Sequence, residues 1–330
     1  MEQAVEFVDM QRRVLIDSDT ASDDAVAIIM ALRSPLIEVV AITGVAGNVG
    51  VEQGTRNALY VAELCGSDVR VYKGANRPLL RELQTADWFH GCDGLGNHGY
   101  SPVYRTAEST HAVDAIVEAA LKYPGIEIVT LGPLTNIALA LEREPRIVGK
   151  VHRCVVMGGA PCCAGNVTPA AEFNIWVDPE AARKVFLSGL PIEMIGWQLS
   201  RFDAVINEHE IAAIEELQNP LAEFAIRCNS AAATAYHTQT GEFGISLPDP
   251  IAMAILLDPG LSVESSMHFV DVETVSNLTR GMTVVDQLNV SGDARNHDVW
   301  REAVVRGSKI KVCWSLDIAG WKSALMKSLS

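Results

Sequence analysis

The sequence predicts an α/β fold: a single open, mostly parallel, Rossmann-like sheet with helices on both faces. Short apolar runs rich in β-branched residues, such as Val14-Leu15-Ile16, alternate with segments of helical periodicity. This alternation is typical of a parallel sheet that is covered on both faces. The chain of 330 residues is 48% hydrophobic and contains no evident repeat, low-complexity tract or linker. We therefore expect one domain over residues 1–330, although the length would also allow two.

Element boundaries follow from apolar periodicity and from cap and turn signals. The first helix begins at Ser22 or Asp23, which are natural N-caps, and stops at Arg33-Ser34-Pro35. Expected strands cover 14–16, 38–43, 69–72, 126–131, 151–157, 192–195, 268–273, 282–286 and 309–314. Expected helices cover 51–65, 111–123, a stretch that residues 132–136 open and that ends at about 143, 178–188, 208–216 and 221–237. A helix capped by Asp249 and an amphipathic C-terminal helix follow.

Residues 73–110 interrupt this alternation, being rich in Gly, Pro, Asp and aromatic residues. A loop of this length inside a compact domain is usually functional or disordered. Within it, His90 is either a loop histidine with a satisfied ring or a hydrogen donor of an active site. The letters Gly94-x-Gly96-x-x-Gly99 match the dinucleotide fingerprint, but no strand precedes them and Tyr100-Ser101-Pro102 cannot open a helix. We therefore reject NAD binding here.

Composition narrows the class of partner and compartment. The chain has 26 Lys and Arg against 41 Asp and Glu, a net charge of −15, which argues against nucleic acid as a partner and favours simple solubility. No apolar run reaches the length of a membrane span, and the first residues lack the basic start of a signal peptide. The seven scattered cysteines suit a reducing cytoplasm, and we interpret the adjacent Cys162-Cys163 as packing residues.

Four aspartates lie within eight residues, directly after the first strand and at the start of the first helix: Asp17, Asp19, Asp23 and Asp24. Open α/β sheets bind ligands in the crevice at this end of their strands. A helix N-terminus offsets only about 0.5–1 kcal/mol per acid, which is too little for converging carboxylates. Because no Cys or His lies nearby to favour zinc, the cluster indicates a hard divalent cation bound by oxygen. The alternative is that two of these residues cap the helix and two are solvated.

Later polar residues are expected at the same edge of the sheet. Asn166, Glu172 and Asn174 follow the strand at 151–157, and their amides and carboxylate suit the recognition of vicinal hydroxyls, although they could simply tie a long loop together. Gly132-Pro133 follows another strand and leaves the carbonyl of Leu131 facing the crevice. An EF-hand is excluded, because its sixth and twelfth loop positions are not Gly and Glu here.

Read together, these motifs resemble the nucleoside hydrolases, the inosine–uridine preferring N-ribohydrolases. The resemblance covers nearly the whole chain, and its motifs are highly specific together although each alone is weak. They are D-x-D-x-x-x-D-D at 17–24, V-x-G-N at 45–48, H-G-x-D-G-L-G at 90–96, L-G-P-L-T-N at 131–136, M-G-G at 157–159, G-N-x-x-x-x-x-E-x-N at 165–174 and D-P at 249–250.

The resemblance implies hydrolysis of the N-glycosidic bond of ribonucleosides to base and ribose. It implies a catalytic Ca²⁺ held by Asp19, Asp24, the main-chain carbonyl of Leu131 and Asp249, with Asp19 as general base for the metal-bound water. Asp17 would support the cluster. The implied substrate contacts are Asp23, Asn48, Met157, Asn166, Glu172, Phe173 and Asn174. The same resemblance implies a homodimer or homotetramer.

The departing base is where this chain differs from the family pattern. Many members carry a histidine immediately before the late metal aspartate, but here that residue is Pro248, which cannot donate a proton. The remaining candidates are the donors His90, Tyr236 and His237 and the stacking surfaces Trp88, Phe173 and Trp197. Tyr236 and His237 precede a Gly-containing loop that could close as a lid, or they form an exposed helix end.

Two other functions are weighed against this one. Asp17-Ser18-Asp19-Thr20 also resembles the opening motif of haloacid-dehalogenase phosphatases, with Asp293 as the late acid, but this leaves Asp23, Asp24 and the 166–174 segment unexplained. A nucleoside- or calcium-binding protein without turnover is favoured by Pro248 and opposed by Asp19, since binding alone needs no base. The sequence does not decide between purine and pyrimidine substrates.

Overall fold

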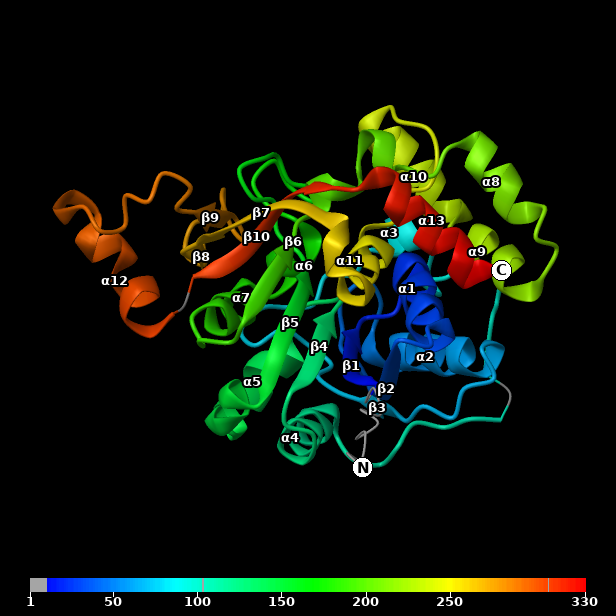
Figure 1. The fold of residues 1–330 in the computed structure, drawn as a ribbon, viewed down its shortest axis with the longest axis horizontal. Helices are drawn as coiled ribbons and strands as arrows, with labels where there is room; N and C mark the ends of the chain where they lie inside the picture. The colour runs from blue at the N-terminus through cyan, green and yellow to red at the C-terminus, as the bar shows by residue number, and fades with distance from the viewer. Residues whose placement is uncertain (1–10, 103, 308) are drawn as a thin grey trace, which may run out of the picture.

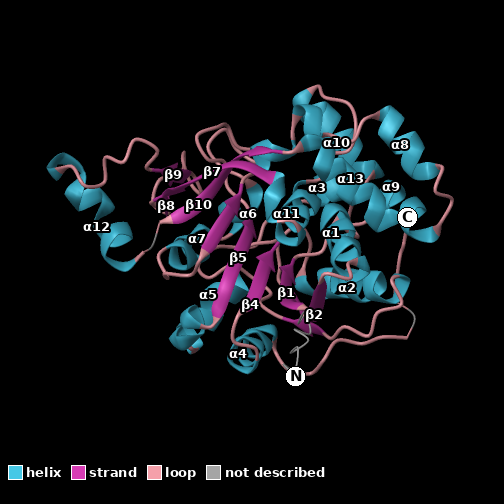
Figure 2. Ribbon diagram, viewed as in Figure 1, coloured by secondary structure: helices cyan, strands magenta, loops and turns pink. Residues whose placement is uncertain are grey.

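The computed structural model describes residues 11–102, 104–307 and 309–330. In these residues an eight-stranded sheet has the order β3-β2-β1-β4-β5-β6-β10-β7, and every neighbouring pair is parallel except β10 and β7 (Figure 2). The strands are β1 (Arg12–Ser18), β2 (Ile37–Gly44), β3 (Val71–Lys73), β4 (Ile126–Thr130), β5 (Val151–Met157), β6 (Ile192–Ile195), β7 (Ser262–His268) and β10 (Ile310–Leu316). The expected α/β class with an open, mostly parallel sheet is confirmed.

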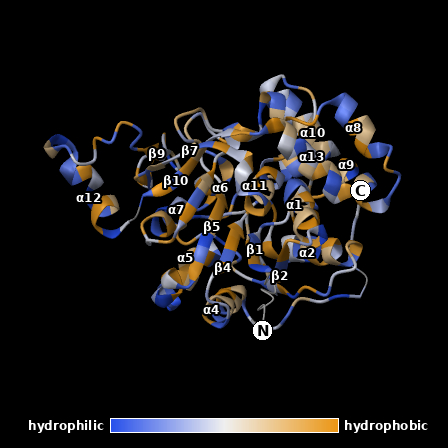
Figure 3. Ribbon diagram, viewed as in Figure 1, coloured by the Kyte–Doolittle hydropathy of each residue, from blue (hydrophilic) through white to orange (hydrophobic). Residues whose placement is uncertain are grey.

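Helices cover both faces of this sheet (Figure 1). One core contains residues of α1 (Ser22–Arg33), α2 (Val51–Leu64), α11 (Pro248–Leu257) and α13 (Ile318–Leu329). The other contains residues of α4 (Ala112–Lys122), α5 (Thr135–Arg143) and α7 (Pro179–Phe186). Val14 and Ile16 belong to the first core and Leu15 to the second, because successive side chains of a strand point to opposite faces. Both faces are therefore buried, which explains the continuous hydrophobic runs along the central strands (Figure 3).

Smaller elements surround the sheet. Helices α8 (Glu208–Glu215), α9 (Pro220–Cys228) and α10 (Ser230–Thr240) group near the C-terminus, and β8 (Val270–Val272), β9 (Thr283–Val285) and α12 (His297–Arg306) form an arm on the opposite side (Figure 1). The long segment after β3 contains α3 (Asp87–His90), and α6 (Phe173–Val177) follows β5. Short 3₁₀ helices cover Pro145–Gly149, Trp197–Ser200, Phe202–Ala204, Pro259–Leu261 and Ala294–Asn296.

Three expected boundaries are wrong. The helix expected at 221–237 is two helices, because Asn229 lies between α9 and α10 and its side chain donates to the carbonyl of Ala225 at 2.9 Å. The strand expected at 268–273 is divided between β7 and β8. The N-cap of α1 is Ala21, whose backbone N–H is bound by Asp24 at 2.9 Å, the reciprocal half of a capping box.

Asp249 likewise differs from its expected place. Leu247 is the N-cap of α11, and Asp249 lies inside the first turn of that helix instead of capping it.

The interpretation of Cys162 and Cys163 as packing residues is wrong, because both side chains are exposed. They lie in the long loop after β5, where the surrounding side chains do not enclose them.

Among the residues described, none of the helices combines the length and the apolar character that crossing a bilayer would need. The N-terminal segment that lacks a signal-peptide pattern lies outside the described residues.

Candidate active site

A cavity opens at the carboxyl ends of the parallel strands, where polar side chains from distant parts of the chain meet. Its empty space is about 740 Å³ including the part of the mouth that is open to solvent. Most of the candidates from the sequence line its wall: Asp23, Asn48, Trp88, His90, Leu131, Met157, Asn166, Glu172, Phe173, Asn174, Trp197, Tyr236, Pro248 and Asp249. Asp19 and Asp24 are fully buried beside it.

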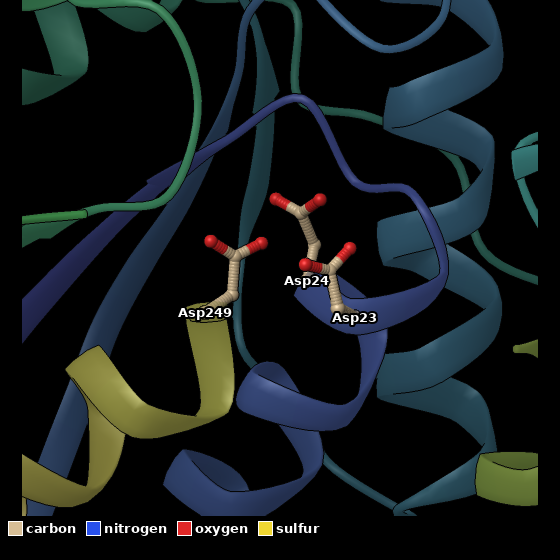
Figure 4. Close-up of side chains that lie close together, drawn as sticks. All are labelled: Asp23, Asp24 and Asp249. Atoms are coloured by element: carbon tan, nitrogen blue, oxygen red, sulfur yellow. The ribbon is translucent and has the colours of Figure 1, made fainter. Parts of the chain in front are cut away.

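Three carboxylates converge at one end of the cavity. Asp23 and Asp24 come from the first turn of α1 and Asp249 from the first turn of α11, and each contributes an oxygen atom that lies within 4.8 Å of the others (Figure 4). All three are buried. Converging buried carboxylates repel one another unless a cation joins them, so this group can hold a metal ion.

Asp19 is enclosed by glycines. Its Oδ2 accepts a hydrogen bond from the backbone N–H of Asn48 at 2.5 Å, while its buried Oδ1 has no hydrogen-bond partner among the residues that the structure describes. A Cβ atom at Gly47 would lie 2.0 Å from Asp19 Oδ2, and one at Gly132 would lie 2.9 Å from Asp19 Oδ1. A side chain at either position would displace this carboxylate. This explains the glycine in each of the two sequence motifs, V-x-G-N at 45–48 and L-G-P-L-T-N at 131–136. Thr20, the next residue, has a φ of +30°, a strained value for a β-branched residue.

Asp17 and Asp24 are held by hydrogen bonds from neighbouring elements. Asp24 accepts from Ser18 Oγ at 2.7 Å in addition to the Ala21 amide. Asp17 accepts from Thr43 Oγ1 at 2.6 Å and from Asn136 Nδ2 at 2.8 Å. Asn136 was part of a sequence motif without an assigned contact; its partner lies 119 residues earlier in the chain, and only the fold brings them together.

Burial raises the pKa of every carboxyl in the cluster. It raises the pKa of Asp17 to about 7 and that of Asp23 to about 8, the latter with a further contribution from the charge of Asp24. The pKa of Asp19 and of Asp249 is raised well above the usual range by burial first and then by neighbouring aspartates. Desolvation is the first cause of each shift, and repulsion from neighbouring aspartates adds to it for Asp19, Asp23 and Asp249. A bound cation would oppose both effects.

The loop after β5 brings together Asn166, Glu172 and Asn174. Glu172 Oε1 accepts from the Asn174 backbone N–H at 2.7 Å and thereby caps α6. Asn174 Nδ2 donates to the carbonyl of Leu131 at 2.8 Å, and Asn166 Oδ1 accepts from the Phe173 N–H at 2.9 Å. These residues therefore tie the loop together and also line the cavity.

His90 faces the cluster from α3. Its Nδ1 lies 2.8 Å from Ser22 Oγ and 3.9 Å from Asp23 Oδ1. Burial lowers its pKa to about 3, so the imidazole is neutral near pH 7 and acts as a hydrogen-bonding group more readily than as an acid. The contact with Ser22 was not expected from the sequence, since no local pattern links the two residues.

Comparison with known proteins agrees with this geometry. A family model described as inosine-uridine preferring nucleoside hydrolase matches residues 14–317. The chain belongs to this family.

Three relatives of the hydrolase illustrate the range of the family. The pyrimidine-specific ribonucleoside hydrolase RihB of Escherichia coli O17:K52:H18 is 38% identical over 291 residues, which are 88% of this chain and 92% of that protein. The structure of a plant nucleoside hydrolase, the PpNRh1 enzyme, has a TM-score of 0.89 and 32% identity, covering 96% of this chain and 98% of its own. A purine-preferring ribonucleoside hydrolase from Gardnerella vaginalis has a TM-score of 0.84 and 31% identity, with the same coverage.

The protein is thus a ribonucleoside hydrolase, an enzyme that cleaves N-glycosidic bonds. The phosphatase alternative does not fit it. Asp293, the late acid that this alternative required, caps the 3₁₀ helix Ala294–Asn296 and pairs with Arg295. That helix belongs to the arm near α12, on the opposite side of the molecule from α1 (Figure 1).

Of the remaining candidates for contact with the base, Tyr236 and Trp197 line the hydrolase cavity and His237 does not. The Tyr236 hydroxyl donates to Glu242, and burial together with this bond raises the pKa of Tyr236 to about 12. His237 is not among the residues that line the cavity; its ring stacks on Phe243 with centroids 3.8 Å apart. Trp197 does line it, and its Nε1 donates to the carbonyl of Ala164 at 2.8 Å.

Proposed function

We propose that this hydrolase uses calcium to convert ribonucleosides to free base and ribose, as a single domain over residues 1–330, with Asp19 as the general base for the attacking water. The observation that carries the proposal is the convergence of the Asp23, Asp24 and Asp249 oxygens within 4.8 Å beside the buried, unpartnered Oδ1 of Asp19. A buried carboxylate oxygen without a partner is costly, and a cation is the group that offsets this cost.

Calcium fits the donors at this site. The ligands proposed from the family resemblance are the carboxylates of Asp19, Asp24 and Asp249 and the carbonyl of Leu131, all of them oxygens, which hard cations prefer. The Leu131 carbonyl accepts one hydrogen bond, from Asn174, and keeps a second lone pair. A bound divalent cation would orient the sugar diol and lower the pKa of a water molecule, so that a carboxylate suffices as base.

The ribose is assigned to the wall between α1 and α6. We assign its hydroxyls to Asp23, Asn48, Asn166, Glu172 and Asn174, with Met157 and Phe173 as apolar contacts, because all seven line the cavity. The N-glycosidic bond breaks through an oxocarbenium-like state with positive charge on the sugar ring. Carboxylates in a site from which water is largely excluded stabilise that charge by several kcal/mol.

For the leaving base, we propose His90 as a neutral hydrogen-bond donor and Trp197 as a stacking surface. If Ser22 Oγ donates to Nδ1 of His90, the proton of the neutral ring is on Nε2 and is available to the base. Tyr236 is a weaker candidate, because its hydroxyl proton is already given to Glu242. His237 is the weakest, because its ring lies against Phe243 outside the wall.

We also propose that the protein is a homodimer or homotetramer, as the family resemblance implies, and that it works in a reducing cytoplasm, which its cysteine usage favours. Exposed apolar side chains on the arm around β8 and β9 are consistent with an interface: Val275 is 90% exposed, Leu278 85% and Leu288 83%.

A nucleoside panel tests the proposed reaction. The protein is treated with EDTA, dialysed, and incubated with inosine, adenosine, guanosine, uridine or cytidine, with and without calcium, and free ribose is assayed. We expect ribose from at least one nucleoside, lost after EDTA treatment and restored by calcium. No ribose from any nucleoside in the presence of calcium would refute the enzymatic proposal, and undiminished release after EDTA would refute the calcium requirement. The purine and pyrimidine arms decide the base preference.

A further inference from the structure

Five charged residues of alternating sign cross the sheet at the end opposite to the cavity. This charged row consists of Arg12, Glu127, Arg153, Glu193 and Lys311, from the adjacent strands β1, β4, β5, β6 and β10. Glu127 is in register with Arg153 on the neighbouring strand, and Glu193 with Lys311. The glutamates are almost fully buried, with side chains only 6% and 4% exposed.

The ion pairs within the row are close. Arg12 binds Glu127 with both Nε and Nη2, each 2.6 Å from a carboxylate oxygen. Arg153 Nε donates to Glu193 Oε2 at 2.8 Å, and Lys311 Nζ lies 2.9 Å from the other oxygen of Glu193. Every carboxylate of the row is therefore compensated, which a buried charge requires.

The two arginines also bind the last carbonyls of α11. Arg12 donates to the carbonyls of Leu256 at 2.6 Å and Leu257 at 3.2 Å. Arg153 donates to the carbonyls of Ile255 at 3.1 Å and Leu256 at 3.2 Å. These carbonyls have no partner within the helix, and their partial negative charge favours cations at this position. The C-terminus of α11 is thus held by two guanidinium groups that are themselves fixed by glutamates of the sheet.

The other end of α11 carries Asp249 into the acidic cluster (Figure 4). From Asp249 to Leu256 the helix rises by roughly 10 Å. Every residue from Asp249 to Leu256 is buried, and apart from Asp249 these side chains are apolar. Apolar contacts are non-directional, so they do not fix the position of α11 along its own axis. That position therefore depends on the polar interactions at the two ends of the helix. At the N-terminal end, the neighbouring aspartates repel Asp249 when no cation is bound.

We propose that Arg12 and Arg153 are positioning residues that clamp α11 so that Asp249 is held in place for the cation despite this repulsion. The inference rests on the metal site proposed above. Lys311 belongs to the same charged row, but its ion pair is with Glu193, and none of the hydrogen bonds found in the described residues joins it to α11. A substitution of Lys311 therefore reports the general contribution of the charged row to stability without removing a contact to α11.

The test compares calcium affinity in Arg153→Met, Arg153→Lys and Lys311→Met by isothermal titration of the metal-free proteins. Arg153→Met leaves Glu193 paired with Lys311, so no carboxylate is orphaned. We expect its calcium Kd to rise about tenfold, the lower end of the range for groups that orient metal ligands. Arg153→Lys keeps one cationic donor and should recover part of the affinity. Lys311→Met should bind calcium like the parent protein.

Thermal unfolding in EDTA and kcat/KM at saturating calcium are measured on the same samples. Recovery of kcat/KM in Arg153→Met at saturating calcium supports a defect in cation positioning. A calcium Kd for Arg153→Met equal to that of the parent overturns the clamp, and so does an equal weakening by Lys311→Met. If the parent itself binds no calcium, this result refutes the proposed cofactor and, with it, the clamp. If the parent binds calcium and the Arg153 variants bind it as tightly as the parent does, the clamp alone is refuted and the proposed cofactor stands.

Discussion

Asp19 combines two properties at the scale of a single residue. One oxygen is fixed by the Asn48 amide, and the other is buried without a partner at the proposed cation site. Asn is nearly isosteric, so Asp19→Asn should fold while losing the base. We expect kcat to fall by about 10²–10⁴-fold, the usual contribution of a general base. Ribose release at saturating calcium measures this.

Stability gives Asp19→Asn an independent readout. Removing one carboxylate from a repelling cluster should raise the midpoint of thermal unfolding in EDTA, because burial and the charge of Asp24 disfavour the ionised Asp19. Asp258→Asn serves as the matched control. Asp258 lies beyond the C-terminal end of α11, and its Oδ1 accepts a hydrogen bond from the backbone N–H of Gly260. Activity equal to that of the parent in Asp19→Asn would rule out the base assignment.

The sequence was most informative about residues whose partners are close in the chain. The aspartates at 17–24 could be assigned to one site because a strand end and a helix start are adjacent there, and the glycine-containing motifs indicated tight contacts. The hydrogen bonds of Ser22 to His90 and of Asn136 to Asp17 could not be predicted, since they join segments 68 and 119 residues apart. A single sequence without aligned relatives carries no signal for such pairs.

At the scale of the helix, α11 begins with Pro248, which fits the first turn because its missing N–H is not needed there. Pro248 also lines the cavity, so a histidine at this position would be next to the space proposed for the nucleoside. We expect Pro248→His to raise kcat/KM about tenfold for uridine but less for inosine, because the poorer leaving group depends more on protonation.

Pro248→Gln is the control for this change, because glutamine offers a hydrogen bond but no titrating acid. Initial rates with both nucleosides are compared across pH 5–8. The same gain for both substrates, or an equal gain in the glutamine variant, would count against protonation as the missing function.

Element prediction succeeded where hydrophobic periodicity was strong and failed where side chains redirect the backbone. The central strands and α1, α2, α4 and α5 lie close to their expected bounds. The division of α9 from α10 depends on the hydrogen bond of Asn229 to Ala225, which periodicity does not report. The charged row was missed for another reason: its members are 26 to 118 residues from their neighbours in the row, and only strand register aligns them.

For the whole molecule, the raised pKa values link stability to pH and to calcium. Asp17 and Asp23 have pKa values of about 7 and about 8 in the folded protein, against about 3.9 in an unfolded chain. The folded protein therefore holds more protons between pH 4 and 8. These two groups contribute stability that is fully present below about pH 4 and is lost as pH rises through 7 and 8.

We therefore expect the metal-free midpoint of thermal unfolding to fall between pH 5 and pH 8 more steeply than the calcium-bound midpoint. Since calcium at the proposed site would displace the bound protons, its affinity should increase over the same range, and the calcium-induced rise in midpoint should be larger at pH 8 than at pH 5. Thermal unfolding with EDTA or saturating calcium at unit pH steps measures both trends. Asp23→Asn removes one of the two carboxyl groups whose pKa is raised, so the metal-free midpoint of thermal unfolding should depend less steeply on pH. A calcium Kd that does not change with pH would mean that these carboxyls do not exchange protons for the cation, and the acidic cluster would then not be the binding site.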